Sequence, residues 1–384
     1  MHPRGVFYIG NFFFSLFVAL ITFVQLSYLS SFMPVAYTGL VIAGGALVAI
    51  FIFPFMPELT ARYSAQWLVL VFAILEIAAL IAIVASPGPL AAVFLVAVTI
   101  ALQPLIAYEL DILLETATTE EGTTGRVRAL FLTAWNLAAL VAVLLIGVLL
   151  ASSDDYSRVF IAAAVALTPF IVLFAMRHLP KGAPPKISNI RDTVRCIVRD
   201  RDLAAVTFGH LLVYLFLIWA PFYTPIYLHA ELGIPWSDLG WIFSIMLLPY
   251  VLIQYPAGAV ADRLLGDKEL MFAGFILAGA SFAAIGFFTT STSLILIAFV
   301  LFASRIGAAL IEGMTEDHFF RRMSEKDVNT IGVWRGIWPL TELAAPIIGS
   351  AILIFGNYQL FFMLTGGFIA IAGVVTTLLI KDFR

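Results

Sequence analysis

Some of the ionisable side chains of this 384-residue sequence stand deep inside long apolar runs. Arg305 lies near the middle of one run, Glu342 lies at a similar depth in the next, and Arg335 precedes Glu342 by seven residues. A spacing of seven places Arg335 and Glu342 on one face of a helix. Charged groups at hydrocarbon depth are costly unless they are paired or face water. We therefore expect either an ion-pair network that only joins helices, or a site that binds an anion and exchanges a proton.

His210 also lies inside an apolar run. It is interpreted either as a proton-transfer group or as a hydrogen-bonded packing histidine. Acidic residues near the ends of two runs are expected to form solvated ion pairs with nearby arginines; they are Glu109, Asp111, Glu115, Glu312, Glu316 and Asp317. The sequence shows no metal-ligand spacing, nucleophile motif or phosphate-binding loop. We therefore predict that the protein is not an enzyme and uses neither a metal nor another cofactor.

The composition indicates a polytopic membrane protein. Hydrophobic residues make up 62% of the chain and charged residues 12%, whereas soluble domains carry about 25% charged residues. The partner that this composition requires is a lipid bilayer, and no feature suggests nucleic acid. The single cysteine, Cys196, excludes an intramolecular disulfide.

Twelve apolar runs of about 20 residues or more are each long enough to cross a hydrocarbon core as a helix. They cover residues 6–31, 35–56, 66–86, 89–113, 127–151, 157–177, 203–229, 236–260, 270–289, 293–313, 329–354 and 358–380. We predict one six-helix bundle over residues 1–180 and a second over 203–384. The connecting residues 181–202 contain arginines at a spacing of four, which predicts a short surface helix in a cytoplasmic linker.

Lysine and arginine are distributed unevenly between the loops. If the N-terminus lies inside, 18 of the 21 basic residues fall in inner loops, one (Arg158) falls in an outer loop, and Arg305 and Arg335 lie within runs. Cytoplasmic loops of membrane proteins carry such an excess of basic residues. We therefore expect both termini to be cytoplasmic and the protein to lie in the plasma (inner) membrane.

The loop after the eighth run carries a spaced motif. Gly258 is followed four residues later by Asp262-Arg263, then by Gly266 and Lys268. This pattern resembles the cytoplasmic loop signature of the major facilitator superfamily of secondary transporters. The loop after the second run, residues 57–64, is similar but has Ala61 where the acid would be.

The resemblance implies twelve helices in two pseudo-symmetric bundles around a central cavity. Gln25 and Gln103 fall on spans that line this cavity in the family, and each is expected to bond either a substrate or a neighbouring helix. The resemblance also implies that Asp262 faces the start of the fifth span, near Arg126, when the cytoplasmic side is closed. Pro221 and Pro225 are expected to interrupt the seventh span near an outer gate.

These observations predict a secondary active transporter, either a symporter or an antiporter. We expect a monomer that moves a small polar or anionic metabolite by alternating access, with protons as the coupling ion. A proton/drug efflux antiporter is the nearest alternative because the chain is rich in aromatic residues. A non-transporting membrane receptor or assembly partner with the same fold is the other.

Overall fold

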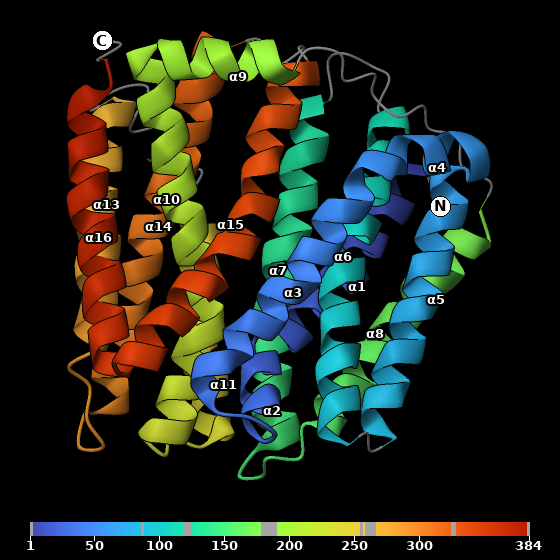
Figure 1. Cartoon of the computed structure of the whole chain (residues 1–384), viewed down its shortest axis with the longest axis horizontal. Helices are drawn as coiled ribbons and strands as arrows, with labels where there is room; N and C mark the ends of the chain where they lie inside the picture. The colour runs from blue at the N-terminus through green and yellow to red at the C-terminus, as the bar shows by residue number, and fades with distance from the viewer. Residues whose placement is uncertain are drawn as a thin grey trace. The chain divides into compact units, whose positions relative to one another are not determined.

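The structure, a computed structural model, describes residues 3–85, 88–117, 124–177, 190–253, 256–257, 266–323 and 328–381. Within these ranges the side chains of residues 3–4, 115–117, 124–132, 328 and 331 are not described. The described chain is helical and contains no strand (Figure 1), which confirms the predicted all-α class. It forms two compact units.

Unit 1 comprises Met1–Pro185 together with Leu228–Ala230 and Ile234–Trp241. In this unit α1 packs against α7 and α8, while α6 packs against α3 and α5. Its helices are α1 Pro3–Thr22, α2 Gln25–Ser30, α3 Val35–Ile52, η1 Phe53–Phe55, α4 Met56–Tyr63, α5 Ala65–Val84, α6 Pro89–Ala117, α7 Thr124–Leu150 and α8 Ser157–Ala175.

Unit 2 comprises Lys186–Tyr227, Glu231–Gly233 and Ile242–Arg384. Here α13 packs against α14 and α16, and α10 packs against α14, α15 and α16. Figure 1 shows the short helix α9 lying across the ends of α10 and α15. The remaining helices are α9 Ile190–Arg199, α10 Arg201–Ile226, the π-helical turn η2 Tyr227–Glu231, α11 Trp236–Leu252, α13 Asp267–Ile285, α14 Leu294–Arg322, α15 Val328–Phe355 and α16 Tyr358–Leu379.

Glycines let the helices of unit 2 approach closely. A Cβ atom on Gly366 of α16 would lie 2.6 Å from the carbonyl oxygen of Gly279 on α13. On the other side of α13, a Cβ on Gly307 of α14 would lie 2.6 Å from the carbonyl oxygen of Gly274. Small residues at such positions allow the close backbone contact that stabilises helix pairs in membranes.

Eleven helices in the described ranges are long and apolar enough to span a membrane, so the chain is a multi-pass membrane protein. The eighth predicted run contains the shorter apolar helix α11, and part of that run lies outside the described residues. Following the charge bias of the sequence, we call the ends where α1 begins and α16 finishes the inner ends. The opposite ends are called the outer ends.

Two predicted helices differ in detail. The first run is divided, because α1 ends at Thr22 and α2 begins at Gln25. The expected interruption at Pro221 and Pro225 is wrong, since α10 continues through both prolines and changes to a π-helical turn only at Tyr227. Each proline lacks an N–H and so removes one hydrogen bond of the helix. Neighbouring helices can satisfy the backbone groups that this leaves free.

Candidate functional site

Arg305 is the most deeply placed cation in the described residues of unit 2. Its side chain is 2% exposed, and its guanidinium carbon lies 4.9 Å from the centre of the Phe216 ring on α10. The Tyr250 hydroxyl of α11 lies close enough to interact electrostatically. Even so, Nε and Nη1 of Arg305 have no hydrogen-bond partner among the described residues. Buried donors without acceptors are costly, so these two atoms favour an anion or another acceptor.

The packing of α14 determines where Arg305 points. Gly307 faces α13, where a side chain would collide with the backbone. Two helical residues correspond to a rotation of about 200°, so Arg305 points away from α13. That direction leads to Phe216 and Tyr250.

The structure does not bring Arg305, Arg335 and Glu342 together. No ion pair joins Glu342 to either arginine among the described residues, although Glu342 is only partly exposed. Arg335 is exposed and instead lies within electrostatic range of Tyr214. The two arginines therefore belong to different environments, because Arg305 contacts α10 and α11 at membrane depth.

His210 lies in an aromatic cluster between α10, α14 and α15. Its ring stacks on Trp334 with 3.7 Å between ring centres, and the ring centre of Tyr214 lies 4.1 Å away. Nδ1 is 3.3 Å from the Thr315 hydroxyl, while the buried Nε2 has no partner among the described residues. The ring is thus held as the packing interpretation expects, and Nε2 is the one atom available for proton exchange.

Gln25 and Gln103 both carry an amide atom whose bonding capacity is unmet. Gln25 is 1% exposed at the first position of α2, directly after the helix break, and its Oε1 has no described partner. Gln103 of α6 is 9% exposed, and its Nε2 has no described partner. Substrate sites of many transporters are formed by discontinuous helices, and Gln25 lies directly after such a break.

Two glutamates of unit 1 are fully buried. Neither oxygen of Glu76 on α5 has a hydrogen-bond partner in the described part of the chain. Glu109 of α6 accepts a 2.5 Å hydrogen bond from the Thr60 hydroxyl of α4. The expectation that Glu109 is a solvated surface residue is wrong, because α4 continues the helical path beyond α3 and covers this part of α6.

The predicted gate falls largely outside the described residues. Gly258, Asp262 and Arg263 are not described, and neither is the side chain of Arg126, so their expected contact stays a prediction. Gly266 has a positive φ of 92° directly before α13, a conformation that favours glycine. Lys268 donates a 3.0 Å hydrogen bond to the carbonyl oxygen of Ile380 and thereby joins α13 to the end of α16.

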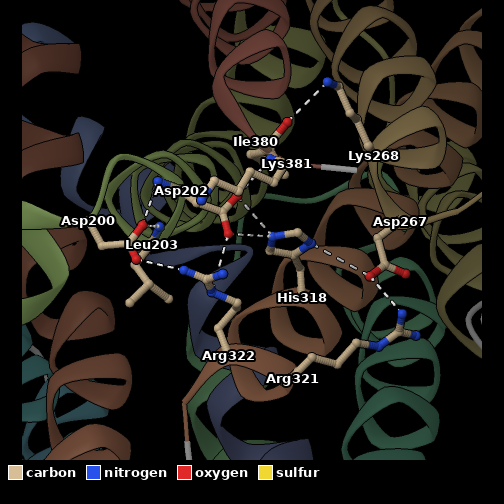
Figure 2. A network of polar contacts seen from close by, with 10 residues as sticks. All are labelled: Asp200, Asp202, Leu203, Asp267, Lys268, His318, Arg321, Arg322, Ile380 and Lys381. Atoms are coloured by element: carbon tan, nitrogen blue, oxygen red, sulfur yellow. Dashed lines mark hydrogen bonds and ion pairs between the residues drawn. The ribbon is translucent and has the colours of Figure 1, made fainter. Parts of the chain in front are cut away.

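A polar network that the sequence analysis did not identify joins the inner ends of α10, α13, α14 and α16 (Figure 2). His318 Nε2 lies 3.2 and 3.3 Å from the two oxygens of Asp202, and Nδ1 lies 3.7 Å from Asp267 Oδ2. All three side chains are at most 5% exposed. We call the set Asp200, Asp202, Asp267, His318, Arg321 and Arg322 the inner network.

The arginines complete the charge balance of the inner network. Arg322 pairs with Asp200 at 2.6 Å and approaches Asp202 at 3.5 Å, while Arg321 lies 3.2 Å from Asp267. Asp200 also caps α10 by accepting the N–H groups of Asp202 and Leu203. Although partial burial acts to raise it, these N–H groups and Arg322 hold the pKa of Asp200 below its ordinary value.

A signal for this network was present in the sequence. Acidic residues begin the seventh and ninth apolar runs, and a histidine and two arginines follow the tenth. Oppositely charged groups at the same membrane side are candidates for pairing, but run order alone does not tell which helices are neighbours.

Residues 206–382 match the family model of the Major Facilitator Superfamily. No curated protein matches the chain in sequence. Among solved structures, the chain is similar to the nucleoside transporter NupG, with 12% identity, a TM-score of 0.76, and 99% of each chain covered. The structure of a mutant form of NupG gives 13% identity and a TM-score of 0.78, covering 98% of this chain and 100% of the other. At this identity the likeness establishes the fold alone, over nearly the whole length of the chain.

Proposed function

We propose that this chain is a proton-coupled transporter of the major facilitator superfamily that moves a small anionic or polar metabolite. The helical fold and the multi-pass character support this proposal. The solute class, the coupling ion, a monomeric state and a plasma-membrane location with both termini inside are parts of the proposal. Alternating access would present a central binding site to one side of the membrane at a time.

The main observation in favour of an anionic solute is the environment of the Arg305 guanidinium. This group is almost fully buried, and two of its nitrogen atoms have no acceptor among the described residues. A protein that kept this cation only for stability would be expected to supply a carboxylate, because an unpaired buried charge costs several kcal/mol. A carboxylate or phosphate group of a solute would instead supply the acceptor when the site opens, and the planar guanidinium can bind it with two bonds.

A nucleoside is the second candidate solute. The solved structures to which the chain is similar are those of a nucleoside transporter. In unit 1, the buried amides of Gln25 and Gln103 have unmet bonding capacity and would suit an uncharged, polar solute. A nucleoside needs no cation, so this candidate makes Arg305 dispensable for recognition.

Uptake by the purified protein in proteoliposomes distinguishes the two candidates. A panel of small carboxylates, phosphate esters and nucleosides would be tested with and without an inward pH gradient. For an anionic solute, Arg305→Lys should reduce uptake roughly 10- to 100-fold, which corresponds to about 1.4–2.8 kcal/mol. The matched variant Arg158→Lys changes an exposed outer arginine paired with Asp155 and should leave uptake unchanged.

Thermal stability separates recognition from structure. Because no described acceptor bonds Nε or Nη1, Arg305→Gln should remove uptake without lowering the melting temperature of the purified protein. A large loss of stability would show that Arg305 serves a structural pair instead. Nucleoside uptake that survives both Arg305 variants would support the second candidate and reject the first.

A further inference from the structure

The outer end of unit 1 contains a contact between two segments far apart in sequence. Residues 228–230 and 234–241 belong to unit 1, and His229 among them contacts Asp154 in the loop that follows α7. The Ser237 N–H donates to the carbonyl oxygen of Ala151 at 3.1 Å. A Cβ on Gly147 would lie 2.8 Å from the Cα atom of Gly240, so the two helices meet there backbone to backbone. We call this contact the outer clamp.

His229 is the polar centre of the outer clamp. Its Nε2 lies 2.7 Å from Asp154 Oδ1, and its Nδ1 lies 2.8 Å from the carbonyl oxygen of Ile234. Trp236 packs against the imidazole ring with 4.8 Å between ring centres. Trp236 in turn meets the ring of Tyr156, so both sides of the clamp hold the histidine in place.

The two bonds of His229 define its charge. A backbone carbonyl and an ionised carboxylate can only accept hydrogen bonds, and a neutral imidazole has only one N–H to donate. Both contacts are satisfied only when each ring nitrogen carries a proton. Asp154 has 67% of its side chain exposed, so its carboxylate stays solvated while it contacts His229. The geometry of the two contacts therefore favours an imidazolium that donates to both acceptors.

The other charged groups near the clamp are consistent with an imidazolium. Glu231 lies two residues away on η2, and Asp238 lies in the first turn of α11. The cation on the loop side is Arg158, which pairs with Asp155 at 3.2 Å and donates to the carbonyl oxygen of Leu149. Two acids thus lie close to His229 along the chain, and the arginine of the loop is paired with Asp155.

We propose that His229 is a proton-binding site on the outer side, and that a proton taken from the outer solution holds the outer clamp closed. The inference deepens the proposed function, because alternating access requires the outer ends to separate in one state and meet in the other. Loss of the proton leaves Nε2 as a lone pair facing a carboxylate. That repulsion opens the clamp, so the outer pH sets how often the outer side is closed.

Crosslinking of the full-length protein tests the proposal without any solute. In a Cys196→Ser background, Ser152→Cys and Ser237→Cys place exposed thiols on the two sides of the clamp. A short bifunctional thiol reagent would be applied to protein in lipid nanodiscs between about pH 5.5 and 8.5, where histidines change charge. Monofunctional labelling of each single-cysteine protein corrects for thiol reactivity. The corrected crosslinking should fall several-fold as pH rises.

Two variants sharpen the test. In Asp154→Asn, the amide can donate to a neutral Nε2, so the clamp should stay closed and crosslinking should be independent of pH. In His229→Phe, the ring contact with Trp236 can persist but both hydrogen bonds are lost, so crosslinking should be low at every pH. A flat profile for the native pair, or an Asp154→Asn profile that falls in parallel with it, would overturn the proposal.

The result is separable from the proposed function. A chain that transports none of the tested solutes yet shows this pH-dependent crosslinking would reject the solute assignment and retain His229 as the proton site. If the protein transports an anion but its crosslinking does not depend on pH, the solute assignment is retained and His229 is rejected as the proton site.

Discussion

Asp202 and His318 face each other across the inner ends of α10 and α14, with both carboxylate oxygens of Asp202 within 3.3 Å of His318 Nε2. Asp202 Oδ1 also accepts the N–H of Lys381, which follows α16. A single fully buried carboxylate thus joins three helix ends (Figure 2). This arrangement makes Asp202 a structural centre of unit 2.

Asp202→Ala should lower the free energy of unfolding by roughly 3–5 kcal/mol, because it leaves the buried partners of that carboxylate without an acceptor. The melting temperature of the purified protein in detergent would measure the effect. The matched variant Asp192→Ala removes an exposed carboxylate that lies 3.9 Å from Arg195, and it should cost at most about 1 kcal/mol. Equal melting temperatures for the two variants would contradict the assigned role.

Asp200 should make stability depend on acid pH. Its pKa is lower in the folded protein than its ordinary value because backbone N–H groups and Arg322 favour the ionised form, although burial opposes this. Such a group contributes stability above its unfolded pKa of about 4, and that contribution disappears as pH falls through the folded pKa. Asp200→Asn keeps a helix cap but removes the titration. Melting temperatures measured from about pH 6 down to about pH 3 should therefore fall less steeply for the variant than for the native protein.

Adjacent glycines of α16 offer a matched pair for helix packing. A Cβ on Gly366 would meet the backbone of Ala283 and Gly279, which cannot move aside, whereas a Cβ on Gly367 has nothing within 4 Å. We expect Gly366→Ala to lower stability by about 1–3 kcal/mol through overpacking. Gly367→Ala should be neutral or slightly stabilising, since alanine favours helix. Thermal denaturation of both variants would check this, and similar losses would argue against the tight α13–α16 contact.

Apolar run length and charge bias were sufficient to predict the helical class and the approximate helix bounds. They did not reveal the division of the first run, because Phe23 and Val24 are apolar residues without a local breaking signal. Gly266 was predicted as a loop residue and does adopt a turn conformation before α13. A turn of this kind can be predicted from the sequence because it depends on only a few neighbouring residues.

Contacts between residues far apart in the chain could not be predicted from the sequence. Glu109 is buried because Thr60, 49 residues away, lies against it. Arg305 was expected beside Glu342 on the adjacent run, but the rotation of α14 directs it to Phe216 and Tyr250. Periodicity gives the face of a helix on which a residue lies, whereas the neighbour that covers this face depends on how helices pack. That information is absent from any single run.

Glu76 should be dispensable for transport. Its carboxyl group is fully buried on α5 with no described partner for either oxygen, so an ionised form would be strongly disfavoured. Glu76→Gln keeps the shape and removes any cost of holding the acid neutral. We expect an unchanged or slightly higher melting temperature and unchanged proteoliposome uptake. Loss of pH-gradient-driven uptake in this variant would instead identify Glu76 as a coupling residue.

Glu342 should behave differently, because its side chain is partly exposed whereas that of Glu76 is fully buried. We predict that Glu342 exchanges the coupled proton within the membrane-spanning part of α15. Glu342→Gln would then abolish accumulation of the solute on a pH gradient but preserve counterflow, in which no net proton movement is needed. Because no ion pair joins Glu342 to Arg305 or Arg335 among the described residues, the variant should keep its melting temperature.

The comparison of Glu342→Gln with Glu76→Gln isolates coupling from the loss of a buried acid, since both changes replace a carboxyl group by an amide at membrane depth. Gradient-driven uptake, counterflow and thermal stability would be measured on the same purified proteins. Only Glu342→Gln should separate the first two activities. If that variant is stable and still concentrates the solute on a pH gradient, coupling must lie elsewhere. His210 is then the next residue to change, because its buried Nε2 has no described partner.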